Sequence, residues 1–314
     1  SININSLIEE TQLKYGLNRY MYKAEIDLLK MNRGNVLEDD IYDLYLSLDL
    51  HDKNESALVR VGRPTFRAKL FLKELFIKTE DQANIVNPYY SFKKFNLSFE
   101  VYRFSIESYN YLRKVMRWSW FIRVLNRNKN IWLIGERTYK AQDTGYAFFR
   151  YMRLNHPDMN VYYVIDKESP ERRNVEKYGN VIFYKSKEHI WNTLIAKKVI
   201  SSHHPDYLYP IRTPLFKRKV KATKVFLQHG VMGTKNMVAN YGKNAIGFDT
   251  DLFMVSSDFE KEIIVNDFGY NPDEVFVTGL SRFDTLFDGK GKTKRQIVII
   301  PTWRDWIVTD EAFL

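Results

Sequence analysis

The sequence contains no cysteine among its 314 residues, which excludes disulfide bonds and thiolate metal sites. This absence fits a reducing compartment. The sequence also lacks an apolar run of about 18 residues, so we expect no segment that spans a membrane as a helix. With 45% hydrophobic and 27% charged residues, the composition is that of a globular protein and not of a disordered one.

Several common motifs are missing as well. The stretch GERTYK (135–140), after the first strand of the expected parallel sheet, has no GxGxxG pattern, and GVMGTKN (230–236) lacks the spacing of a P-loop. No GxSxG elbow and no HExxH helix occurs. His203 and His204 are adjacent, which is poor geometry for two ligands of one metal ion. The sequence therefore identifies no cofactor and no metal site, and it leaves open whether a divalent cation assists.

Positive charge is what the chain has in excess. There are 48 Lys and Arg residues against 38 Asp and Glu residues, a net charge of +10. Such an excess favours anionic partners such as nucleic acid, lipid headgroups or phosphorylated substrates, although a basic solubilising surface explains it equally well. Zinc-finger spacing and an RNP1-like motif are absent and the lysines are dispersed, so we expect no nucleic acid partner.

The first 128 residues predict three segments. Apolar positions near helical spacing in 6–30 predict an N-terminal helical segment at 1–55. The runs ALVRVG, AKLFLKELFI and NLSFEVYRF predict a small β domain at 56–106. Residues 107–128 then predict a basic amphipathic helix, with an apolar stripe of Leu112, Val115, Ile122 and Leu125. This helix suits either an anionic membrane surface or packing on its own domain, and both interpretations stay open.

Strands and helices alternate through residues 129–290. Short β-branched or aromatic runs are separated by segments with helical potential, which predicts an α/β fold with a Rossmann-like parallel sheet. The expected strands are NIWLIG, VYYVID, VIFY, KVISS, KVFLQ, DLFMVS and VFVTG. A linker and a further strand, QIVIIPTWRDW, follow at 291–314, and we expect them to begin a second domain of which the chain holds only the first strand.

His229 is the clearest catalytic candidate. It follows the strand KVFLQ directly, and ligands of parallel sheets bind at the carboxyl ends of strands. A neutral imidazole there can accept a proton from a hydroxyl nucleophile. Gly230 would let the backbone approach a ligand closely, and a helix opening at GTKNM would offer amide groups to an anion. A strand-end histidine that only caps a carbonyl is the structural alternative.

Three motifs in order resemble one family. QHG after a strand, TGLSRFD at 278–284 and PTWRD at 301–305 are similar to the signatures of the CDP-glycerol glycerophosphotransferase family of teichoic acid and capsule synthesis. IGERTYKAQDTGYAFFRYM resembles the first β–α unit of that family, and NPYYSFKKFNLSFEV resembles the β appendage of some members. The likeness covers roughly residues 84–314. Thr144, Ser281 and the pair Val231–Met232 depart from the family pattern, which puts the polyol and the acceptor in doubt.

The resemblance implies a GT-B architecture, in which residues 129–290 are the acceptor-side domain and 291–314 begin a truncated donor-binding domain. The implied reaction transfers glycerol phosphate or ribitol phosphate from a CDP-activated donor to a hydroxyl of a lipid-linked polyol-phosphate or glycan acceptor, with release of CMP. The implied location is the bacterial cytoplasm, peripheral on the inner face of the cell membrane. A GT-B glycosyltransferase that uses a nucleotide sugar, and a basic membrane-binding module without catalysis, are the alternatives.

The resemblance also assigns residues to roles. His229 is the implied general base, and Thr302 and Arg304 are the implied donor phosphate ligands, since guanidinium groups match phosphate oxygens. The residues implied on the acceptor side are Glu136, Arg137, Asp143, Gly145, Gly230, Arg282 and Asp284. For Arg282 and Asp284, a structural role at the corner between the domains is equally expected.

Overall fold

The computed structural model describes residues 7–12, 16, 18–22, 25–50, 55–91, 94–233, 235–286, 297 and 299. The chain divides into two compact units, Ser1–Arg282 and Phe283–Leu314. The linker and strand expected at 291–314 lie outside the described residues, apart from Ile297 and Ile299.

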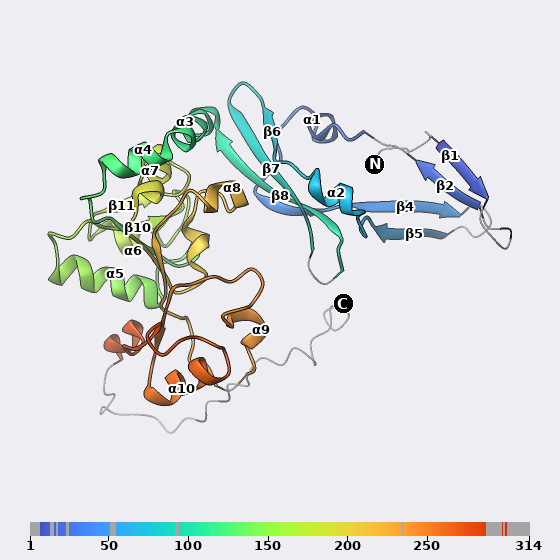
Figure 1. The fold of residues 1–314 in the computed structure, drawn as a ribbon. Helices are drawn as coiled ribbons and strands as arrows, with labels where there is room; N and C mark the ends of the chain where they lie inside the picture. Colours follow the sequence, from blue (N-terminus) through green and yellow to red (C-terminus); the bar gives the residue numbers. More distant parts are fainter. Residues whose placement is uncertain are drawn as a thin grey trace. The chain divides into compact units, whose positions relative to one another are not determined.

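A seven-stranded parallel sheet forms the centre of the first unit, in the order β11-β10-β9-β12-β13-β14-β15, and every pairing in it is parallel (Figure 1). The α/β fold expected for residues 129–290 is therefore confirmed, and each of the seven expected strands is present. The strands are β9 (Trp132–Gly135), β10 (Val161–Ile165), β11 (Val181–Phe183), β12 (Lys198–Ser201), β13 (Thr223–Phe226), β14 (Leu252–Val255) and β15 (Val275–Val277).

Helices cover both faces of this sheet. Successive strand residues point to opposite faces, so Leu133 joins one buried cluster and Ile134 another. Figure 1 shows α7 on one side of the sheet and α5 on the other. The helices of this region are α5 (Thr144–Asn155), α6 (Arg172–Glu176), α7 (Lys187–Ile195), α8 (Pro214–Lys217), α9 (Val238–Tyr241) and α10 (Asp258–Asn266), with the 3-10 helices η2 (Pro205–Leu208) and η3 (Ser281–Thr285). The helix expected to open at GTKNM is α9, which begins at Val238 and has four residues.

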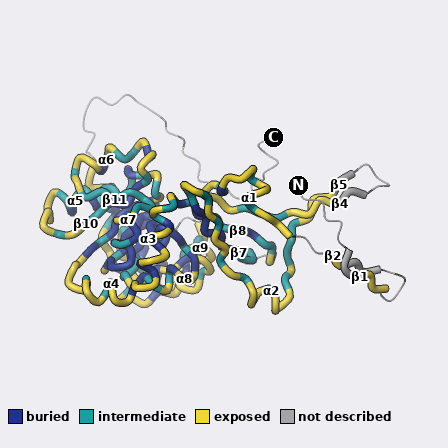
Figure 2. Tube along the Cα trace, turned by 90° about the horizontal axis from the view of Figure 1, so that it is seen from above, coloured by how far each residue is buried: buried dark blue, intermediate teal, exposed yellow. Residues whose placement is uncertain are grey.

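A four-stranded antiparallel sheet precedes the parallel one, in the order β3-β8-β7-β6. Its strands are β3 (Asp40–Asp43), β6 (Leu75–Lys78), β7 (Gln82–Tyr90) and β8 (Leu97–Ser105), and β4 (Tyr45–Leu50) pairs with β5 (Glu55–Arg60) in a separate hairpin. Ala83, Ile85, Tyr102 and Phe104 of β7 and β8 belong to the same buried cluster as Leu133 of the parallel sheet. The two sheets therefore share one core, which appears as the dark band around α3 and α7 in Figure 2.

The prediction of a helical segment at 1–55 is wrong. β1 (Leu7–Gln12) and β2 (Asn18–Tyr22) form an antiparallel hairpin, and the one helix described in this range is α1 (Leu28–Met31). Gly16 between the two strands has φ 72°, a conformation that favours glycine and turns the chain. The expected strand AKLFLKELFI also begins in a helix, because its first three residues belong to α2 (Phe66–Leu70), which precedes β6. Thr65 caps α2 by accepting a hydrogen bond from the Ala68 amide.

The helix expected at 107–128 is two helices, α3 (Ile106–Arg117) and α4 (Ser119–Leu125). Leu112, Val115 and Ile122 are buried in the shared core, whereas Leu125 is exposed. The interpretation of these residues as a lipid-facing stripe is therefore wrong, and three of the four pack on their own domain. None of the helices in the described part of the chain is long and apolar enough to cross a membrane.

Candidate functional site

Three neighbouring strands end at one edge of the parallel sheet and bring distant segments together. The chain runs from β9 to β10 and β11, and then returns to β12 on the other side of β9. Open α/β sheets bind ligands at the carboxyl ends of their strands, where the strand order reverses in this way. The side chains that follow β9, β12 and β13 include Arg137, His203 and His229. This edge, with its loops, is the candidate site.

His229 lies where the sequence placed it, just after β13. Its Nδ1 atom is 3.0 Å from the carbonyl oxygen of Ser202, which can only accept, so Nδ1 carries the proton and donates it. The Nε2 atom is therefore the one with a lone pair. A histidine in this tautomer can take a proton from a hydroxyl group at Nε2.

Gln228 explains why the ring leaves the sheet at this point. Its φ of 62° is unusual for a residue with a side chain, and it turns the chain at the end of β13. The fully buried Gln228 amide donates a 2.6 Å hydrogen bond to the carbonyl of Met254 in β14. The neighbouring strand thus holds the strained residue that directs His229, a role that the sequence analysis did not identify.

His203 is a second residue that the sequence analysis missed as part of the site. Its ring stacks on that of His229, with 4.4 Å between the centroids and 4° between the planes. Burial lowers the pKa of His203 to about 4, and the neighbouring His229 and Arg137 act in the same direction. His203 is therefore neutral at neutral pH. The position of this residue directly after the strand KVISS was the available signal.

His204 has different surroundings from His203. Its Nδ1 atom lies 3.0 Å from the Asp206 amide nitrogen and its Nε2 atom 3.1 Å from the Asp249 amide nitrogen. Burial lowers the pKa of His204 to about 4. In the described ranges, no group of three or more His, Cys, Asp or Glu side chains could hold a metal ion.

Glu136 occupies the N-terminus of α5. The buried carboxylate accepts hydrogen bonds from the amides of Asp143 and Tyr146, both at 2.8 Å, and from that of Gln142 at 3.3 Å. Burial raises the pKa of Glu136, while the three amides act in the opposite direction. Amides at this position bind phosphate in many nucleotide-binding folds. Here the protein fills that position with its own carboxylate, so Glu136 organises the loop.

Two glycines of the candidate site differ in what surrounds them. A Cβ added to Gly145 would lie 2.5 Å from the carbonyl oxygen of Gly135 and 2.9 Å from Cγ of Glu136. Only glycine lets α5 approach the end of β9 so closely. A Cβ added to Gly230 would meet nothing within 4 Å, so the space beside His229 is open on that side.

Asp143 and Arg282 form an ion pair at the start of α5. Asp143 caps the helix by accepting from the Thr144 amide, and Nη1 of Arg282 is 2.6 Å from its Oδ1. The hydroxyl of Ser281 donates to the Thr144 carbonyl at 2.7 Å. These contacts fasten the chain after β15 to the candidate site. Asp284 is exposed in η3, and Thr302 and Arg304 lie outside the described residues.

A second buried glutamate holds the loop after His229. Glu260 of α10 accepts from the Met232 amide at 2.6 Å, and from the amide and hydroxyl of Ser256 at 2.6 and 2.7 Å. The side chain is 1% exposed, so these contacts are made away from water. Glu260 thereby fixes the path of the chain after Gly230.

Arg137 brings an exposed positive charge to the same edge. Its guanidinium carbon lies 5.7 Å from the ring centroid of Tyr207, and its charge acts on His203 and on Tyr241. The Tyr241 ring meets that of His229 edge-on at 6.3 Å. None of the carboxylates in the described ranges pairs with Arg137. A cation, two stacked imidazoles and two phenol rings therefore line the edge, which suits an anionic substrate that carries hydroxyl groups.

Comparison with known proteins matches the chain to two family models. Residues 115–314 match the model of the CDP-glycerol:poly(glycerophosphate) glycerophosphotransferases, and residues 1–101 match that of the TarS beta-glycosyltransferase C-terminal domain 1. The minor teichoic acid biosynthesis protein GgaB of Bacillus subtilis strain 168 is 30% identical over 194 residues, which are 59% of this chain. The chain spans only 20% of the length of GgaB.

Solved structures of the wall teichoic acid polymerase TagF are also similar. One, soaked with CDPG, is 16% identical with a TM-score of 0.42, and the match covers 66% of this chain and 59% of that one. Another TagF structure is 15% identical with a TM-score of 0.33, covering 57% and 48% of the two chains.

Proposed function

The chain belongs to the CDP-glycerol:poly(glycerophosphate) glycerophosphotransferase family, and from this we propose that it transfers glycerol phosphate or ribitol phosphate from a CDP-activated donor to an acceptor hydroxyl. The observation that carries the proposal is the tautomer of His229. Its Nδ1 donates to the Ser202 carbonyl, which leaves the lone pair of Nε2 to act as a base.

In the proposed step, the acceptor O–H gives its proton to Nε2 of His229. The oxygen attacks the distal phosphorus of the donor, the bond between that phosphorus and the bridging oxygen breaks, and CMP leaves with the electron pair. His203 is a neutral neighbour whose ring packs flat on that of His229. A neutral neighbour does not repel the imidazolium that forms during the step.

We assign the acceptor to the parallel-sheet domain. Two observations support this assignment: one argues against a nucleotide at this edge, and the other favours a different anion. Glu136 already takes the helix amides that would hold a pyrophosphate, whereas the guanidinium of Arg137 pairs with no carboxylate of the described residues. In this proposal Arg137 contacts the acceptor, and Asp143, Gly145 and Arg282 shape the loop around it. Thr302 and Arg304 remain the proposed ligands of the donor phosphates.

The proposal places the protein at the inner face of the bacterial cell membrane, acting on a lipid-linked acceptor. The support is a group of apolar side chains around α4 that are each at least 51% exposed, namely Trp118, Trp120, Phe121 and Leu125. Lys114 and Arg117 of α3 are exposed nearby in the sequence. Aromatic rings with basic neighbours suit the headgroup layer of an anionic bilayer.

A donor screen on the full-length protein tests the proposal. CDP-glycerol, CDP-ribitol and UDP-sugars would each be supplied with a polyol-phosphate acceptor, and the released nucleotide would be measured. We expect CMP from one of the CDP-polyols and no UDP. Release of UDP alone would contradict the proposal and support a nucleotide-sugar glycosyltransferase, the alternative that the glycosyltransferase-associated match of residues 1–101 favours.

A further inference from the structure

The ring of Tyr207 in η2 lies under two guanidinium groups. The guanidinium carbon of Arg212 is 4.9 Å from the ring centroid and that of Arg137 is 5.7 Å from it. Such contacts between a cation and an aromatic face are attractive. Tyr207 is only four residues after His203, so the ring belongs to the same loop as the stacked imidazoles.

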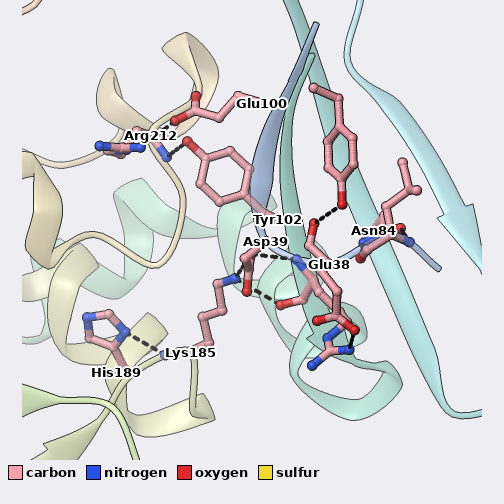
Figure 3. Close-up of polar contacts among 11 residues, drawn as sticks. Glu38, Asp39, Asn84, Glu100, Tyr102, Lys185, His189 and Arg212 are labelled. Atoms are coloured by element: carbon pink, nitrogen blue, oxygen red, sulfur yellow. Dashed lines mark hydrogen bonds and ion pairs between the residues drawn. The ribbon is translucent and has the colours of Figure 1, made fainter. Parts of the chain in front are cut away.

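Arg212 is itself held by the antiparallel sheet. Its Nη2 atom is 2.6 Å from Oε1 of Glu100, and its backbone amide donates to the hydroxyl of Tyr102 at 3.1 Å. Figure 3 shows both residues of β8 reaching Arg212 from the neighbouring sheet. The Glu100 side chain is only 16% exposed, so this pair is shielded from solvent more than a surface pair is. The position of Arg212 is therefore set by a different sheet from the one that carries the candidate site.

The contacts form a continuous path from β8 to the edge of the parallel sheet. Glu100 holds Arg212, Arg212 lies over Tyr207, and Arg137 lies over the same ring. Arg137 is exposed, and long exposed side chains sample many rotamers. A fixed aromatic face restricts that freedom and keeps the guanidinium beside His203 and His229.

We propose that Arg212 is a positioning residue for the acceptor: by fixing Tyr207 it holds Arg137 where the guanidinium can bind an acceptor phosphate. The antiparallel sheet thereby takes part in substrate binding, and the acceptor carries a phosphodiester close to the hydroxyl that attacks. This inference rests on the proposed function, because it concerns the acceptor of that reaction. The inference goes beyond the proposed function because it gives strand β8 a part in recognising the acceptor.

The test compares Arg212→Lys with a charge exchange in the full-length protein. Lysine keeps the charge beside Glu100 but lacks the planar group that covers an aromatic ring. We expect the KM for a glycerol phosphate oligomer to rise about tenfold, with kcat within about twofold of wild type. The double variant Glu100→Arg with Arg212→Glu restores an ion pair to β8 and removes the guanidinium of residue 212 from the Tyr207 ring, so that Arg137 is the cation left there. The thermal stability of this double variant should be close to that of wild type, while its KM for the oligomer stays raised.

A purely structural role gives a different result. In that case the exchanged pair would restore KM together with stability, and the inference would be overturned. Asp39→Asn is the matched control, because Asp39 joins the same two sheets through Lys185 at a point that does not contact Tyr207. We expect this variant to lose stability with an unchanged KM. If Arg212→Lys fails to fold, Glu100→Gln replaces it, with a smaller rise in KM expected.

Calorimetric binding of the same oligomer separates this inference from the proposed function. If the wild type transfers nothing from any CDP-polyol but binds the oligomer, and Arg212→Lys weakens that binding, the positioning role stands and the proposed reaction fails. If the wild type is active and Arg212→Lys has the wild-type KM and affinity, the reaction stands and the positioning role is wrong.

Discussion

The edge of the parallel sheet and the junction between the two sheets both gather ionisable side chains, but they differ in how the exposed or nearly buried cation at each is paired. At the junction, Lys185 is 11% exposed, pairs with Asp39, and donates to the Arg103 carbonyl at 2.9 Å (Figure 3). Three rings also surround its ammonium group, since those of Tyr102, Phe104 and Tyr184 have centroids 4.9 to 5.6 Å away. At the edge, Arg137 has the Tyr207 ring and no carboxylate partner among the described residues. The cation of the junction is therefore paired within the protein, whereas that of the edge is exposed and has no carboxylate beside it among the described residues.

The two regions also differ in the hydrogen bonds of one histidine in each. His189 of α7 accepts from the Lys185 amide at Nδ1, at 3.0 Å, and donates to the Leu208 carbonyl from Nε2, at 2.7 Å. Both of its nitrogens are used, whereas His229 uses Nδ1 alone as far as contacts among the described residues go. The same side chain can therefore be a structural part in one region and a base in the other.

Replacing His229 should have the largest effect. Loss of general-base assistance typically lowers rates by about 10²–10⁴. We expect His229→Ala in the full-length protein to lower CMP release by that factor, with a melting temperature close to that of wild type. His156→Ala is the matched control, because His156 is an exposed histidine at the C-terminal end of α5 and should leave the rate unchanged.

The comparison fails if His229 turns out to behave like His189. A variant with near-normal turnover, or one that loses its fold, would assign His229 a structural role. In that event the difference in ring contacts would not distinguish the two regions.

Acid should weaken the junction through His189. Burial lowers the pKa of this histidine to about 4, against an ordinary value near 6.5 in the unfolded chain. The neutral ring therefore stabilises the fold above pH 6.5, and this contribution is lost as pH falls toward 4, at about 1.4 kcal/mol per pH unit. His189→Gln should reduce the slope of unfolding free energy against pH by that amount, as measured by denaturant titrations from pH 7 to 4.

Part of the slope should remain in that variant, because His203 and His204 also have pKa values lowered to about 4. An unchanged slope in His189→Gln would mean that its ring takes up protons in the native state. The description of the junction as shielded from solvent would then be wrong.

How much the sequence reveals differs between the parallel sheet and the N-terminal hairpin. The strands of the parallel sheet were predicted because each is a short β-branched or aromatic run, as in VIFY and KVISS, that contains its own signal. Residues 6–30 were misread because their apolar spacing fits a helix, while the hairpin depends on pairing between β1 and β2 across Gly16. Such pairing between two strands leaves little trace in the apolar spacing of a single sequence.

The candidate site follows the same rule. His229 was found because it stands beside its own strand. His203 and Gln228 were missed because their roles depend on β12 lying next to β13, and on β14 supplying a carbonyl, which only the strand order reveals. Glu136 was identified as a site residue, but its contact with the amides of α5 required the path of the loop.

Removing one charge from the junction should cost less than the loss of His189 neutrality. Burial lowers the pKa of Lys185, and the Asp39 carboxylate opposes that shift. Asp39→Asn leaves a nearly buried ammonium group without its anion, so we expect the free energy of unfolding to fall by about 2 kcal/mol. Glu38→Gln is the control, because Glu38 is 69% exposed where it pairs with Arg103 and should change stability by less than about 0.5 kcal/mol.

Equal effects of these two variants would remove the distinction between the pair at the junction and an ordinary surface pair. Chemical denaturation at pH 7 measures both on one scale.

The smallest expected effect concerns a third region, the exposed rings around α4. Lys114 and Arg117 of α3 resemble Arg137, since neither pairs with a carboxylate in the described ranges. If an unpaired cation marks a contact with an outside anion, neutralising Lys114 should weaken binding to anionic vesicles, by about 1 kcal/mol or about fivefold at low salt. Lys114→Gln would be compared with Lys167→Gln, an exposed lysine on the loop after β10, by co-sedimentation. Equal vesicle binding by both variants and the wild type would mean that the cations near α4 are solvated and bind no anionic surface. An unpaired cation would then mark a binding contact at the sheet edge and not near α4.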